Sequence, residues 1–184
     1  MGRCPPITIM FRQLLNNADF LGDGRDRRHG FRHECLEIVT TQVERYAPDG
    51  MDQIEFSPVD VYLSPTASLH VGLALHELAV NAASYGSLSV PGGKVSIDAR
   101  IEDHGEETAL VIAWQERGGP RVRPERDARF GTSTLERIVP NAVGGSARLE
   151  YLAEGIRYTL TVPEAQYEVA RVDARRDLAP PVHA

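Results

Sequence analysis

Two polar side chains interrupt an otherwise aliphatic stretch, LALHELAVNAASYGSLS, which spans residues 73 to 89. Glu77 and Asn81 are four residues apart, about 6 Å and about 40° beyond a full helical turn, so they share one stripe with Ser84. An amide oxygen suits a hard cation such as Mg²⁺, which takes its remaining ligands from water and substrate phosphates. A carboxylate one turn away could order or deprotonate a nucleophile. The alternative interpretation is the solvent face of an amphipathic helix.

A second polar stretch, AWQERGGPRVRPERDARFGTSTLER, follows later in the chain. Glu116 could accept a hydrogen bond from an exocyclic amine, and Gly118 and Gly119 would let backbone approach a ligand closely. At the far end Gly131 and Thr132 begin a helix, whose free N–H groups suit a phosphate. We expect the segment between these two ends to be a mobile lid. The alternatives are a solvated arginine-rich loop, an RNA contact or an ordinary hairpin.

The elements that must position these residues follow from the hydrophobic pattern. Ser64 is a good N-cap, Pro65 suits a first turn and Gly86 suits a helix end, which predicts a helix over 66–85. The other predicted elements are strands over 54–56, 59–63, 94–102, 108–116, 146–153 and 156–163 and a helix over 132–141. This order predicts an α+β fold, a two-layer α/β sandwich with a mixed sheet and helices on one face.

The same pattern divides the chain into four parts. Residues 1–30 are expected to form a short helix and a linker that are poorly ordered, and residues 31–47 form an amphipathic helix. The compact domain covers 48–164. Residues 165–184, charged and ending in prolines, are expected to be a loose tail.

Composition narrows the function classes. The 184 residues are 42% hydrophobic, which is enough for one domain with a real core, and a net charge of −6 argues against general nucleic-acid binding. Cys4 and Cys35 form no metal pattern, and so few thiols suggest a reducing cytoplasm. No window is apolar enough for a membrane span, and no signal peptide is evident. Lys94 is the only lysine available to hold a phosphate.

Taken together and in this order, the motifs resemble the catalytic ATP-binding domain of the HWE histidine kinases, in the superfamily of gyrase and the heat-shock chaperone ATPases. HELAVNAASYGSLS resembles the family's Asn-containing box, with His76 as the eponymous histidine. AWQERGGP supplies the Trp-x-Glu as Trp114 and Glu116, and FGTSTLER resembles the glycine box. The resemblance covers about residues 47–163 and implies a Bergerat-type α/β sandwich.

The resemblance also implies a function. Asn81 would hold Mg²⁺, Glu77 would be its polar or basic catalytic partner, and Glu116 would read the adenine amino group. The ATP site implied by the family further includes Ser84, Tyr85, Gly118, Gly119, Arg129, Phe130, Gly131 and Thr132. Such proteins transfer the γ-phosphoryl group of ATP to a histidine and thence to a response-regulator aspartate, commonly as homodimers joined through a helical hairpin. Residues 31–47 resemble the end of the second helix of that hairpin.

Some positions depart from the family pattern. Ser84 stands where the family usually has a lysine, and Arg129 stands where a glycine commonly precedes the phenylalanine. His29 and His33 lack the neighbours of a phosphoacceptor box, so the target histidine is expected on a separate chain or on a hairpin outside this sequence. Two other functions stay open: a degenerate histidine phosphotransfer or regulatory module that binds no ATP, and a serine kinase of the anti-sigma-factor type.

Overall fold

A five-stranded mixed sheet forms the centre of the computed structural model, which describes residues 33–34, 42–43, 46, 50–105, 107–121 and 130–169. Its strand order is β2-β4-β5-β7-β6. The strands are β2 (Ile54–Ser57), β4 (Lys94–His104), β5 (Glu107–Arg117), β7 (Gly155–Pro163) and β6 (Ser146–Leu152). β2 runs parallel to β4 and the other neighbours are antiparallel, as the prediction of a mixed sheet requires.

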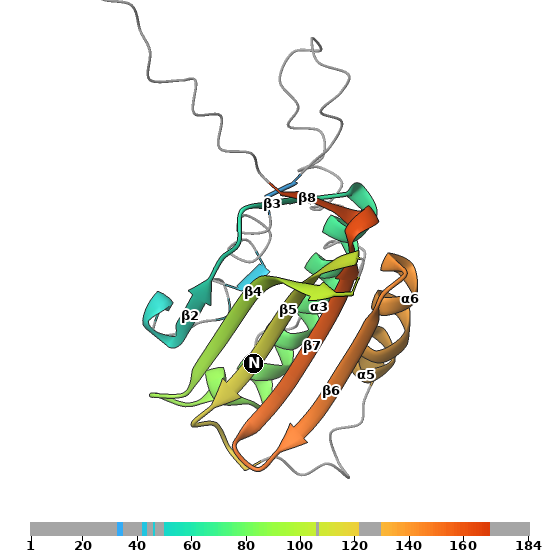
Figure 1. The fold of residues 1–184 in the computed structure, drawn as a ribbon. Helices are drawn as coiled ribbons and strands as arrows, with labels where there is room; N and C mark the ends of the chain where they lie inside the picture. The colour runs from blue at the N-terminus through green and yellow to red at the C-terminus, as the bar shows by residue number, and fades with distance from the viewer. Residues whose placement is uncertain are drawn as a thin grey trace, which may run out of the picture.

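The long helix α3 (Pro65–Ser84) packs against one face of this sheet (Figure 1). Its start is set by Ser64, whose Oγ accepts a hydrogen bond from the amide of Ala67 at 3.1 Å. The apolar stripe of the helix is buried and contributes Val71, Leu75, Leu78 and Ala82 to the core. From the sheet this core receives the alternate residues Val95, Ile97, Trp114, Tyr158 and Leu160.

A second helical segment lies on the same face and departs from the prediction. It consists of α5 (Phe130–Ser133), the π-helical turn η4 (Thr134–Ile138) and α6 (Val139–Val143). The sequence pattern predicted one regular helix over 132–141, but the amide of Val139 donates to the carbonyl of Thr134, five residues back. Pro140 has no N–H and its ring crowds the carbonyl four residues back, which is why a regular α-helix is disfavoured here.

A small antiparallel sheet near one end of the large one was not predicted. It joins β1 (His33–Glu34), β3 (Val61–Leu63) and β8 (Tyr167–Val169), with β3 in the middle. The predicted helix over 31–47 is therefore wrong at His33 and Glu34, although Gln42 and Val43 are helical. The predicted loose tail is wrong for its first residues, because the turn η5 (Glu164–Gln166) and β8 are folded. Residues 1–30 and 170–184 lie outside the described residues.

The other face of the five-stranded sheet carries no helix in the described part of the chain (Figure 1). On β4 its side chains are polar, and charged neighbours pair along that strand: Arg100 contacts both Asp98 and Glu102. On the neighbouring β5 the same face carries the apolar Ala109, Val111 and Ala113. The helices therefore lie on one face, as predicted. None of the helices among residues 50–105, 107–121 and 130–169 is long and apolar enough to cross a membrane.

Candidate active site

The polar stripe predicted on α3 lies at the margin of its packed face. Glu77 and Asn81 are half-buried and Ser84 is exposed, whereas the apolar stripe is fully buried. Within the described part of the chain, neither the Glu77 carboxylate nor the Asn81 side-chain amide has a hydrogen-bond or ion-pair partner. Burial raises the pKa of Glu77 above its ordinary value. The stripe thus presents a carboxylate suited to accept a proton and an amide oxygen suited to coordinate a cation.

Glu116 lies at the end of β5 on the helix side of the sheet and is only 1% exposed. Its Oε2 accepts a hydrogen bond from the amide of Ser87 at 2.9 Å, and its Oε1 accepts one from Nε1 of Trp114 at 3.4 Å. Burial raises the pKa of Glu116, and the hydrogen bonds from Ser87 and Trp114 partly oppose that rise. The two sequence boxes therefore meet, because Ser87 opens the turn η3 (Ser87–Ser89) directly after α3.

Glycines make this close meeting sterically feasible. A Cβ on Gly86 would overlap Oε2 of Glu116 and would lie 2.8 Å from the backbone of Ala82. A Cβ on Gly119 would lie 2.7 Å from the amide nitrogen of Ser87, and one on Gly93 would overlap the Ser87 carbonyl. The lack of a side chain at Gly86 and Gly119 therefore allows the end of α3, the turn η3 and the end of β5 to pack in direct contact.

Ser87 is a site residue that the sequence analysis did not single out. Its Oγ is buried and has no hydrogen-bond partner among the described residues. Each oxygen of the neighbouring Glu116 carboxylate accepts one hydrogen bond, and a carboxylate oxygen has the lone pairs to accept a second. A carboxylate can accept a hydrogen bond from an aromatic amine, and a hydroxyl beside it can donate one to an adjacent ring nitrogen. Only its position after Gly86, at the end of the Asn-containing box, could have indicated it.

The predicted phosphate end lies at the start of α5. Oγ1 of Thr132 is 3.2 Å from the hydroxyl of Tyr151 on β6, which ties the first turn of the helical segment to the sheet. Gly118 has a φ of +71°, a conformation that favours glycine where β5 ends. Phe130 and Gly131 are described as helical backbone. Arg129 and the predicted lid over 122–129 lie outside the described residues.

Two further residues of the Asn-containing box differ in their surroundings. Tyr85 is 59% exposed at the C-terminal end of α3, next to Ser84. His76 is buried, its Nδ1 lies 3.4 Å from the hydroxyl of Tyr46, and the two rings meet edge to face at 5.6 Å. His76 is therefore a buried histidine that contacts another side chain rather than one exposed to a ligand.

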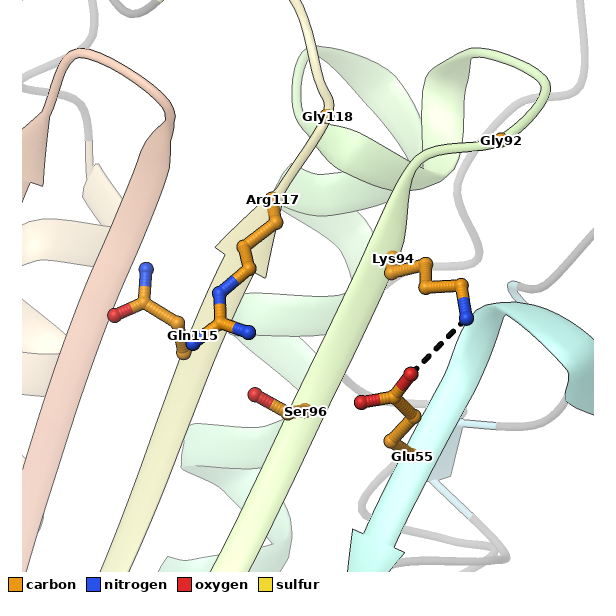
Figure 2. Close-up of a pocket in the computed structure, with 7 residues that line it drawn as sticks. All are labelled: Glu55, Gly92, Lys94, Ser96, Gln115, Arg117 and Gly118. Carbon is orange, nitrogen blue, oxygen red and sulfur yellow. Dashed lines mark hydrogen bonds and ion pairs between the residues drawn. The ribbon is translucent and has the colours of Figure 1, made fainter.

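Lys94 is not part of this site. Its ammonium group donates a hydrogen bond to Glu55 at 3.0 Å on the open face of the sheet (Figure 2). A shallow hollow of about 150 Å³ lies there, lined by Glu55, Gly92, Lys94, Ser96, Gln115, Arg117 and Gly118. Lys94 precedes the buried Val95, and side chains alternate along a strand, so it points away from the face that carries Glu116. The one lysine of the chain is therefore directed away from Glu116 and toward Glu55.

Comparison with known proteins identifies relatives by sequence. No protein-family model matches the chain. It is 34% identical over 135 residues to blue-light-activated histidine kinase 1 of Erythrobacter litoralis, an alignment that covers 72% of this chain. It is 30% identical over 129 residues to the blue-light-activated histidine kinase of Rhizobium johnstonii, which covers 70% of this chain. The chain spans 36% of the length of each of these relatives.

A solved structure shows the same fold. The histidine kinase domain of a blue-light-activated histidine kinase from Erythrobacter litoralis superposes with a TM-score of 0.54 at 16% identity, covering 83% of this chain and 70% of that one. In this chain, the packing of α3 on the sheet brings together the two sequence boxes that contain Asn81 and Glu116. The chain belongs to the HWE type of histidine kinase and has the fold of the catalytic ATP-binding domain.

Proposed function

We propose that the chain binds ATP with Mg²⁺ between α3, the loop after β5 and the start of α5, and transfers the γ-phosphoryl group to a histidine. The observation that carries this proposal is the unpaired, half-buried pair Glu77 and Asn81 on the helix whose C-terminal end contacts Glu116. The names of the relatives, which are all histidine kinases, support the same chemistry.

Each described residue has a role in this proposal. Glu116 accepts a hydrogen bond from the adenine amino group, and the buried hydroxyl of Ser87 donates to a ring nitrogen. Asn81 supplies an amide oxygen to Mg²⁺, which neutralises phosphate charge when bound. Within the described residues no three His, Cys, Asp or Glu side chains gather at one point, so most ligands of the ion would be phosphate and water oxygens.

The transfer step uses Glu77. A nitrogen of the acceptor imidazole forms a bond to the γ-phosphorus while the bond to the bridging oxygen breaks, and ADP leaves. The imidazole loses a proton, and the Glu77 carboxylate, whose pKa is raised by burial, takes it. The acceptor histidine lies on a separate chain or on a hairpin outside this sequence, and the phosphoryl group then passes to an aspartate of a response regulator. Homodimers and a cytoplasmic location are part of the same proposal.

Calorimetry with a non-hydrolysable ATP analogue, with and without Mg²⁺, tests the binding half. We expect binding that depends on Mg²⁺ in the unmodified protein and that is lost in Asn81→Ala. His70→Ala is the matched control, because His70 lies on α3 but near its other end, where Nδ1 contacts the Thr66 carbonyl. No heat from the unmodified protein at millimolar analogue, with or without Mg²⁺, would refute the proposal and favour a degenerate binding module.

Labelled ATP tests the transfer half. The protein, mixed with dimerisation hairpins of related kinases, is expected to give acid-labile phosphate on the hairpin, as phosphohistidine does. Acid-stable phosphate would point instead to a serine kinase of the anti-sigma-factor type. Transfer that survives in Glu77→Gln at the original rate would remove the proposed role of that carboxylate.

A further inference from the structure

The π-helical turn after the phosphate end leaves one carbonyl without a helical partner. In an α-helix the carbonyl of Leu135 would accept from the amide of Val139, but that amide donates to Thr134. In a π turn the donor would be residue 140, which is a proline and has no N–H. Leu135 is only 2% exposed, so bulk water cannot donate a hydrogen bond to its carbonyl either.

The missing donor comes from the sheet. The hydroxyl of Tyr158 on β7 donates to the Leu135 carbonyl at 3.0 Å, and both residues are buried. The Tyr158 hydroxyl therefore replaces the N–H that Pro140, in a different element, lacks. An unsatisfied buried acceptor is expensive, so this bond adds to the Thr132–Tyr151 contact and the core packing that hold the helical segment against the sheet.

Tyr158 also lies between the two ends of the proposed nucleotide site. On one side it is directly paired with Trp114, which shares a hydrogen bond with Glu116. On the other side its hydroxyl holds Leu135, one turn after Thr132 at the phosphate end. The strand residue thus connects the adenine-binding end with the helix that begins at the phosphate-binding end.

We propose that Tyr158 is a positioning residue for the nucleotide, which sets the rotation of the helical segment that carries Thr132 relative to Glu116. This inference rests on the proposed function. A π turn holds one more residue than an α turn, so its loss would rotate the preceding residues by about 100° around the helix axis. Tyr158 prevents that rotation by satisfying the carbonyl that the π turn exposes.

The test exploits the match between Tyr158 and Pro140. In Pro140→Ala, residue 140 regains an N–H, which can donate to the Leu135 carbonyl while the π turn is retained. Rescue of stability without rescue of binding would mean that the segment has changed to an α turn, and would overturn the positioning role of Tyr158. The four proteins are the unmodified chain, Tyr158→Phe, Pro140→Ala and the double variant. Each is measured for unfolding in urea and for affinity toward the non-hydrolysable ATP analogue with Mg²⁺.

Tyr158→Phe should lower the folded-to-unfolded ratio roughly ten-fold, the scale expected when a buried acceptor loses its donor. It should also weaken analogue binding about ten-fold at temperatures where the variant stays folded. Pro140→Ala added to Tyr158→Phe should restore both quantities to within about two-fold, although it removes a second native residue. Rescue of binding as well as stability is the signature of positioning.

Tyr167→Phe is the matched control. It removes another buried phenol hydroxyl, that of Tyr167 in the small sheet, which lies 2.8 Å from Oγ1 of Thr108 on β5 and makes no hydrogen bond to the helical segment in the described part of the chain. We expect a loss of stability, no change in analogue affinity and no rescue by Pro140→Ala. Additive effects of Tyr158→Phe and Pro140→Ala on stability would overturn the inference. An unmodified protein that fails to bind the analogue would instead refute the proposed function, and with it the positioning role.

Discussion

At the scale of single residues, two carboxylates on the same side of the sheet have different surroundings. Both Glu77 and Glu116 have a pKa raised by burial. Glu116 is held by two donors and cannot move without losing them, whereas Glu77 has none in the described part of the chain. A fixed carboxylate is suited to recognise a ligand group, and a free one is suited to exchange a proton.

Glu77→Gln should separate activity from stability. Because the native pKa lies above the ordinary value of 4.5, the folded state holds a proton longer than the unfolded state. The stability contributed by this group is complete below about pH 4.5 and is lost as pH rises through the raised pKa. At pH 7 the variant should therefore be as stable as the unmodified protein or slightly more stable, while phosphoryl transfer falls by about 10² to 10⁴.

Urea unfolding at pH 4.5 and pH 7, together with transfer rates, checks this prediction. Glu107→Gln is the control, because Glu107 is exposed at the start of β5 and should change neither quantity. Equal losses of stability and rate in Glu77→Gln at pH 7 would assign Glu77 a structural role.

At the scale of elements, the end of α3 and the end of β5 pack so closely that no space remains between them for an added methyl group. Gly86 has a negative φ of −103°, so glycine is needed there for space rather than for conformation. The space is taken by the carboxylate of Glu116, which in turn holds the amide of Ser87. The position of the Glu116 carboxylate thus depends on Gly86 and Ser87, which connect α3 to β4.

Gly86→Ala should disturb this junction. The new methyl group would displace Glu116, with a stability loss of about 2 kcal/mol from overpacking and roughly ten-fold weaker analogue binding. Gly92→Ala is the matched control in the same connection. A Cβ there meets nothing within 4 Å, although its φ of +79° makes the substitution strained by about 1 kcal/mol. Unchanged binding in Gly86→Ala would show that Glu116 does not contact the ligand.

Regular elements with a strong pattern could be predicted from the sequence. The helix at α3 begins and ends within one residue of its predicted limits, because its apolar stripe is long and Ser64 and Pro65 mark its start. The strands β4 and β5 extend only one or two residues beyond the predicted ranges. A proline inside the predicted helix over 132–141 was the signal for irregular geometry, but the π turn also depends on Tyr158, which is distant in sequence.

Site residues were predictable by type but not by environment. The alternation of core and surface residues along β4 would have placed Lys94 on the other face of the sheet from Glu116. Its ion pair with Glu55 depends on the parallel pairing of β2. Nothing in a three-residue run such as Tyr167–Val169 distinguishes a strand from a tail. Ser87 can be recognised as a site residue only from the structure, in which its amide donates to the Glu116 carboxylate.

At the scale of the whole molecule, the small sheet fastens segments from both ends of the described chain to β3. Tyr167 is 7% exposed and its hydroxyl contacts Thr108, so β8 contributes to the core as well as to the sheet. The folded domain therefore extends to Val169 rather than to residue 164.

A chain ending at Pro163 should lose roughly 3 kcal/mol of stability or more, the scale for removal of a large buried aromatic side chain. A chain ending at Val169 retains β8 and is the control. Thermal or urea unfolding of the two proteins measures the difference. Equal stability of both would mean that β8 adds nothing to the fold.

Ser64 belongs to two elements at once. Its Oγ caps α3 by accepting from Ala67, and its own amide donates to the carbonyl of Gln166 at 2.8 Å. Detachment of the C-terminal segment and fraying of the first helical turn are therefore one cooperative opening rather than two. In native-state hydrogen exchange, the amide protons of Ser64 and Ala67 should share one opening free energy and lose protection together.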